Sequence, residues 1–72
     1  MTYSFYYFNS NTDDKGNHEV HTEVCAFLPS ESNRVLIGYY SSCEEAIEKA
    51  KLLYPTYTFD GCFFCCNSCH KG

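Results

Sequence analysis

Cysteine and histidine are the residues of this chain best suited to chemistry, and most of them are crowded into its last third. The sequence has six cysteines and three histidines among 72 residues. In Cys62-Phe63-Phe64-Cys65, two cysteines with two residues between them directly follow Gly61. With this spacing, a tight turn directs both sulfurs toward one tetrahedral ion about 2.3 Å away, while backbone N–H groups donate to the sulfurs. The motif predicts one half of a zinc site.

The other half of the site is expected from the segment His21-Thr22-Glu23-Val24-Cys25. Residues four positions apart on an extended strand are about 13 Å from one another, so a shared ion requires the chain to bend between His21 and Cys25. An ion closed across these distant segments would supply much of the stability of the fold. The predicted zinc ligands are His21, Cys25, Cys62 and Cys65.

Two further residues leave this ligand set open, because Cys69 and His70 follow soon after Cys65. Either one could take the place of His21 on the ion. The cysteines could also form disulfides or stay free, as in a disulfide-stapled exported protein. A reducing compartment keeps thiols free and favours the metal interpretation.

The run Cys66-Asn67-Ser68-Cys69-His70 also matches the C-x-x-C-H pattern of c-type haem attachment. Haem attachment usually follows export, and no signal peptide is visible in the sequence. Met1 is the only methionine, which leaves His18 or His21 as the usual kind of sixth ligand. The haem interpretation is therefore much weaker than the zinc interpretation.

Three more residues have chemistry that the site does not use. Cys43 begins an expected helix, where the dipole lowers a thiol pKa, yet it is interpreted as a small, partly buried residue. Cys66 is interpreted as a bystander. His18 is interpreted as a solvated histidine in a turn.

The elements expected to position these residues form an α+β fold with a small antiparallel sheet of three or four strands and one helix. Ser41 and Ser42 each precede a glutamate by three residues, which predicts a helix start, and Pro55 predicts its end. The helix is expected over residues 43–54. Alternating or β-branched and aromatic residues predict strands over the ranges 2–8, 20–26, 34–40 and 56–59.

The length and charge of the chain limit the number of domains and the kinds of partner that it can have. A domain near this size buries only about 60% of the surface of its unfolded chain, so we expect a single domain, residues 1–72, stapled by metal. The formal charge is −4, with five scattered basic residues, which disfavours nucleic-acid binding. Without a signal peptide or an apolar run long enough to span a bilayer, the chain is expected to be cytoplasmic, with no membrane role.

The residues described so far resemble the small zinc domains similar to the N-terminal module of the Ada DNA-repair protein, including short bacterial relatives. The resemblance covers about residues 17–72 and depends on Val20-His21-x3-Cys25-x2-Leu28-Pro29, on Gly38, on Ala46 and Ala50, and on Asp60-Gly61-Cys62-x2-Cys65. It implies the same four ligands. His21 stands where the repair protein has its methyl-accepting thiolate, which argues against methyl transfer by this chain.

The expected function is a non-enzymatic binding module. A full set of three cysteines and one histidine closes a zinc site to substrates, and Cys69 with His70 lacks a third group to orient a catalytic pair. Seven tyrosines and six phenylalanines exceed what so small a core can bury. Some rings are therefore expected at the surface, where they could bind a protein partner or a small ligand. The alternative is an Ada-like domain that contacts nucleic acid or accepts alkyl groups.

Overall fold

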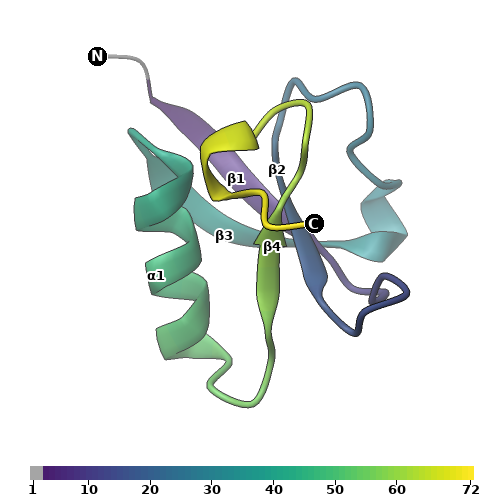
Figure 1. Ribbon diagram of the computed structural model, residues 1–72. Coiled ribbons are helices and arrows are strands. Elements are labelled where there is room, and N and C mark those ends of the chain that lie inside the picture. The colour runs from purple at the N-terminus through teal and green to yellow at the C-terminus, as the bar shows by residue number, and fades with distance from the viewer. Residues whose placement is uncertain (1–2) are drawn as a thin grey trace.

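A computed structural model describes residues 3–72, and within this range the chain forms a four-stranded sheet, one α-helix and two single-turn 3-10 helices (Figure 1). The helix packs against one face of the sheet. The α+β class expected from the sequence is confirmed. In chain order the elements are β1 (Ser4–Asn9), β2 (His18–Thr22), η1 (Glu31–Asn33), β3 (Arg34–Tyr40), α1 (Cys43–Leu53), β4 (Phe59–Gly61) and η2 (Asn67–Cys69).

The strands lie in the order β3-β1-β2-β4. The central strand β1 is antiparallel to both β2 and β3, as expected, whereas β4 is parallel to β2. The expectation of an antiparallel sheet is thus wrong for this one strand. The physical reason is the helix: α1 carries the chain back along the sheet after β3, so β4 starts at the same end as β3 and runs in its direction.

The core lies between the sheet and α1. Along β1 the side chains alternate, so Tyr6 and Phe8 point inward while Phe5 is exposed. Ala46 and Ala50 of α1 are fully buried against this face, and their small side chains let the helix approach the sheet closely. The buried apolar cluster is Tyr6, Phe8, Val20, Ile37, Cys43, Ala46, Ala50, Phe59 and Cys66.

The helix start contains one half of the expected capping box of Ser42 with Glu45, because the Glu45 carboxylate reaches back to Ser41 and not to Ser42. Ser42 is the N-cap, and its hydroxyl accepts a hydrogen bond from the Glu45 backbone N–H at 3.2 Å. The Glu45 carboxylate accepts from the Ser41 backbone N–H at 3.1 Å. The second box, Ser41 with Glu44, does not form in this way, because the Glu44 carboxylate lies 3.5 Å from the Cys43 thiol instead.

Replacing Ser42 with alanine should lower the free energy of unfolding by about 1 kcal/mol, because one N–H at the helix start loses its partner. Denaturant unfolding of the metal-loaded protein measures this as a lower midpoint with an unchanged slope. Ser41→Ala is the comparison and should cost less, because its hydroxyl donates to the Glu45 carboxylate on the exposed surface and caps no helix N–H. Equal losses in the two variants would contradict the assignment of the cap.

Strand ends differ from the expected ones where the chain turns. β1 replaces the strand expected over 2–8, of which Thr2 lies outside the described residues. β2 ends at Thr22, short of 26, because the Cys25 N–H donates to the Thr22 carbonyl at 3.2 Å and closes a turn. β4 occupies 59–61 instead of 56–59.

His18 is not the solvated residue that the sequence suggested. It is 7% exposed, its Nδ1 lies 2.8 Å from the Asn9 carbonyl, and its ring stacks on Tyr57 at 4.5 Å. The carbonyl can only accept, so Nδ1 carries the proton and donates. The expectation was wrong because the pairing of β4 beside β2 brings the preceding aromatic segment over His18.

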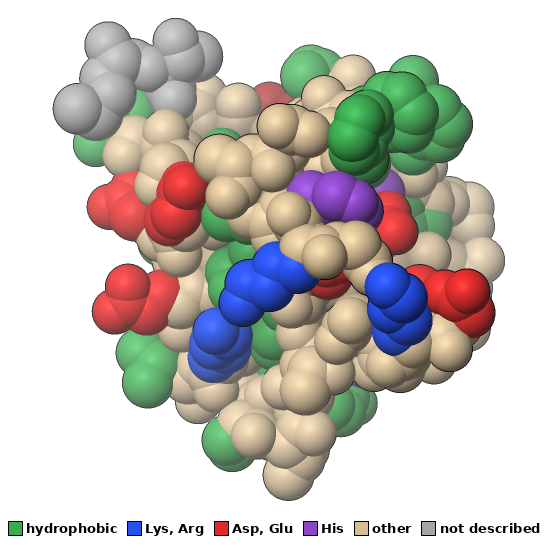
Figure 2. Space-filling model, viewed as in Figure 1, with side chains coloured by type: hydrophobic (Ala, Val, Ile, Leu, Met, Phe, Trp, Pro, Cys, Tyr) green, Lys and Arg blue, Asp and Glu red, His purple; other side chains and the backbone are tan. Residues whose placement is uncertain are grey.

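The surface carries both signs of charge, and acidic and basic side chains both occur on the face seen in Figure 2. Within residues 3–72, no helix combines the length and apolar character needed to cross a membrane.

Candidate metal centre

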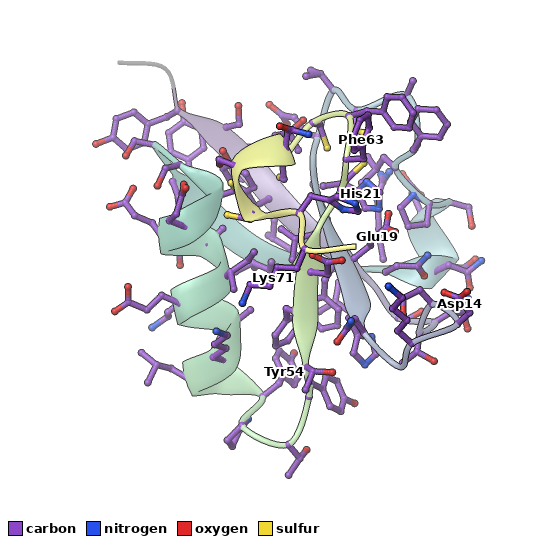
Figure 3. All side chains as sticks on the ribbon, in the orientation of Figure 1. Asp14, Glu19, His21, Tyr54, Phe63 and Lys71 are labelled. Carbon is purple, nitrogen blue, oxygen red and sulfur yellow. The ribbon has the colours of Figure 1, made fainter. Side chains whose placement is uncertain are left out.

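The parallel pairing of β2 with β4 places two of the predicted ligands, His21 and Cys62, side by side. The register aligns Val20 with Gly61, and the Cys62 N–H donates to the Val20 carbonyl at 3.0 Å. His21, the next residue of β2, and Cys62, directly after β4, therefore lie at the same end of two neighbouring strands. Figure 3 shows His21 beside the chain that continues from β4.

Cys25 reaches the same place because the chain bends immediately after β2. The turn closed by the Cys25 N–H and the Thr22 carbonyl is followed by a second one, in which the Leu28 N–H donates to the Cys25 carbonyl at 3.1 Å. The bend that a shared ion demands between His21 and Cys25 is thus present.

Cys62 and Cys65 lie on a tight knuckle. The Cys66 N–H donates to the Cys62 carbonyl at 2.8 Å, which closes the loop, and the Thr22 N–H points at the Cys65 sulfur at 3.4 Å. An N–H directed at a ligand sulfur stabilises the thiolate form.

The four predicted ligands meet at distances that suit one tetrahedral ion. The Cys25 Sγ lies 3.6 Å from His21 Nδ1 and 3.9 Å from Cys62 Sγ, and Cys65 Sγ lies 3.9 Å from His21 Nδ1. All four ligand atoms lie within 4.8 Å of one another. Metal–sulfur bonds of about 2.3 Å and metal–nitrogen bonds of about 2.0 Å place neighbouring ligand atoms about 3.5–3.8 Å apart in a tetrahedron. The group could therefore hold a metal ion.

Burial prepares the histidine for this role. His21 is 2% exposed, and desolvation lowers its pKa, which keeps the ring neutral as a ligand must be. Its Nδ1 faces the sulfurs, while its Nε2 lies 3.6 Å from a Glu19 carboxylate oxygen. A carboxylate behind the ring favours the proton on Nε2 and leaves Nδ1 free to bind the ion.

Burial has the opposite effect on the pKa of Cys65. Desolvation, followed by the hydrogen bond with Cys25, raises the pKa of Cys65 to about 12. Three thiolates so close together repel one another, and a bound cation removes that repulsion. The pocket is thus unfavourable for bare thiolates and favourable for a metal ion.

The two substitutes considered from the sequence lie outside this group. The Cys69 sulfur is 2.8 Å from that of Cys43, at the start of α1. His70 Nδ1 donates to the Gly61 carbonyl at 2.9 Å and lies 3.8 Å from an Asp60 carboxylate oxygen. The structure thus directs both side chains toward other partners.

The haem pattern meets a steric obstacle in the fold. Cys66 is 2% exposed within the buried cluster, and this desolvation raises its pKa. Its thiol could not reach a haem without opening the core. Cys66, interpreted from the sequence as a bystander, is part of the buried core.

The sequence did not lead us to predict two features near the candidate metal centre. Glu19 and His21 stand two apart on one strand, so period-two alternation could have placed the carboxylate beside the ring. A second group, Cys43 with Glu44 and Cys69, joins residues distant in the chain, and no local pattern could have found it.

Gly61 is required by close packing under the knuckle. A Cβ there would lie 2.5 Å from the Cys66 carbonyl oxygen and 2.7 Å from the Cys69 Cβ. Gly61→Ala should therefore displace the knuckle, lower the free energy of unfolding by about 1–3 kcal/mol and weaken metal retention. Gly16→Ala is the control for metal retention: its φ of +83° makes alanine strained there, but a Cβ meets nothing within 4 Å, so this variant should lose stability and keep its metal. Full metal content in Gly61→Ala would contradict the close packing.

Comparisons of the chain with protein-family models, with curated proteins and with solved structures gave no match.

Proposed function

We propose that this chain is a small zinc-binding module without catalysis of its own, in which a structural ion supports a surface that binds a protein partner. The observation that carries the proposal is the meeting of His21, Cys25, Cys62 and Cys65 at tetrahedral separations.

The donor set supports zinc as the ion. Three thiols and one imidazole suit zinc, whereas magnesium and calcium prefer oxygen ligands. Four protein ligands complete a tetrahedron and leave no open position for water or substrate, as in structural sites. A reducing compartment such as the cytoplasm would keep the three thiols available.

The position of the ligands supports a structural role. His21 lies near the end of β2 and Cys25 just after it, and Cys62 and Cys65 follow β4, so the ion would join two segments that are far apart in the sequence. Because the unfolded chain has no preformed site, the binding free energy contributes directly to folding.

Exposed aromatic side chains beside the ligands support the binding role. We define the phenylalanine patch as Phe27, Phe63 and Phe64, which are 56%, 55% and 67% exposed. Phe27 and Phe64 stack with ring centroids 4.3 Å apart, and Phe63 meets Phe64 edge-on at 5.2 Å. Figure 2 shows hydrophobic side chains above the histidines, where Figure 3 labels Phe63.

The patch favours a protein partner over nucleic acid. Clustered exposed aromatic rings are typical of protein interfaces. The chain carries a formal charge of −4, and three thiolates with one divalent ion would make it more negative by one unit. Phosphate groups would therefore be repelled.

Native mass spectrometry of the protein, isolated with and without chelator, tests the zinc assignment. We expect one zinc ion per chain, removed by chelator. A chain that carries iron, or that folds with no metal, would overturn the assignment.

A labelled DNA duplex tests the Ada-like alternative. We expect no binding at physiological salt and no methyl transfer to any cysteine from a methylated phosphotriester. Binding under these conditions would favour the nucleic-acid role over the protein-binding role.

A further inference from the structure

A second pair of thiols lies apart from the candidate metal centre. Cys43 is the first residue of α1 and Cys69 the last residue of η2, and their sulfurs are 2.8 Å apart. Within the candidate metal centre, the sulfurs of Cys25 and Cys62 are 3.9 Å apart. The sulfurs of Cys43 and Cys69 are thus much closer to the separation in a disulfide, about 2.05 Å.

This separation does not suit a second tetrahedral ion. With metal–sulfur bonds of about 2.3 Å, sulfurs 2.8 Å apart would close the angle at the metal to about 75°. The third member of the group, Glu44, is an exposed carboxylate whose oxygen lies 3.5 Å from the Cys43 sulfur. The Ser68 hydroxyl lies 3.1 Å from the same sulfur and adds only a weak metal ligand.

We propose that Cys43 and Cys69 form a reversible disulfide, made by exchange with small disulfides of the glutathione type. Both residues are thiols in the structure. The bond would join the start of α1 to the segment after the knuckle, independently of the metal centre.

Access to the pair comes through Cys69. This residue lines an open depression of about 350 Å³ together with Glu44, Ile47 and Lys71. Cys43 is 6% exposed, so a small reagent meets Cys69 first and Cys43 acts as the second thiol.

The thiol–disulfide exchange takes place in two steps. The Cys69 sulfur attacks one sulfur of the small disulfide, whose S–S bond breaks and releases the first small thiol. The Cys43 sulfur then attacks the Cys69 sulfur, the new S–S bond forms, and the second small thiol leaves. The protein pair loses two electrons and two protons, and the two small thiols gain them.

The exchange is slow at neutral pH. Burial and the neighbouring Cys43 raise the pKa of Cys69 to about 12, so little of the nucleophilic thiolate is present. Samples therefore need equilibration for hours.

Peptide mapping of the zinc-loaded protein, equilibrated with oxidised and reduced glutathione and quenched in acid, tests the proposal. Cleavage after arginine and lysine leaves Cys43 as the only cysteine in peptide 35–49, while peptide 52–71 holds Cys69 with three others. We expect oxidation to remove two alkylatable thiols per chain, to link these two peptides and to leave the zinc bound. Fragmentation of the linked pair should place the bond at Cys69.

The variants Cys43→Ser and Cys69→Ser should lose the link and keep one zinc ion per chain, which shows that they fold. Three outcomes overturn the proposal: both thiols stay alkylatable at oxidising ratios, fragmentation places the bond at Cys66, or the reduced protein holds a second metal ion that Cys43→Ser loses. Fragmentation of the wild-type link decides the case even if a variant fails to fold.

Discussion

Cys62→Ser is expected to abolish stoichiometric zinc binding and to unfold the chain. Cys62 is 2% exposed and its sulfur lies 3.9 Å from that of Cys25. Serine is a poor zinc ligand, so an ion there would keep three strong ligands and an open position. Native mass spectrometry should show the variant without metal, and circular dichroism should show loss of ordered structure.

Cys69→Ser is the matched control for this substitution. It makes the same chemical change seven positions along the chain, outside the group of four ligands. It should keep one zinc ion and the native spectrum. Retention of metal by Cys62→Ser, or its loss from Cys69→Ser alone, would show that the ligand set is wrong.

Removing the ion from the wild-type protein by chelator or acid should also unfold it. Structural zinc sites contribute about 10–16 kcal/mol of apparent binding free energy near pH 7, whereas the core of so small a domain supplies about 3–5 kcal/mol. The metal term is the larger one, and without it the balance of burial against chain entropy in so small a domain is close to zero, so the fold should not survive its loss.

The sign of the pH dependence follows from the ligand pKa values. The Cys65 thiol, with its pKa raised to about 12, holds its proton at pH 7 until the ion displaces it. Metal affinity should therefore fall at least about tenfold for each unit that the pH is lowered. Burial of His21 separately makes the fold less stable at low pH, because its pKa is lowered and below about pH 6.5 the unfolded chain binds a proton there that the folded chain does not.

Competition with a zinc-sensitive dye between pH 6 and pH 8 measures this slope. A metal affinity that does not change with pH would mean that no thiol proton is displaced.

The sequence was informative wherever a local pattern determined the outcome. The helix follows from the serines and glutamates at its start and from Pro55 after it. The bend between His21 and Cys25 follows from the demand that both reach one ion, and the structure places it at Thr22.

The sequence was less informative where long-range pairing decided the structure. The parallel direction of β4 depends on the path of α1 across the sheet, and the burial of His18 depends on β4 in turn. The contact between Cys43 and Cys69 joins the helix start to the segment after the knuckle. No residue spacing in the sequence predicts these long-range contacts, which depend on how the helix and strands pack.

The place of β4 beside β2 has a consequence during synthesis. β4 is made after the other three strands, and until it docks, β2 presents unpaired N–H and C=O groups along its outer side. Such an open edge recruits strands from other molecules. Because the ion would hold the end of β4 next to the end of β2, nascent or metal-starved chains should aggregate through this edge.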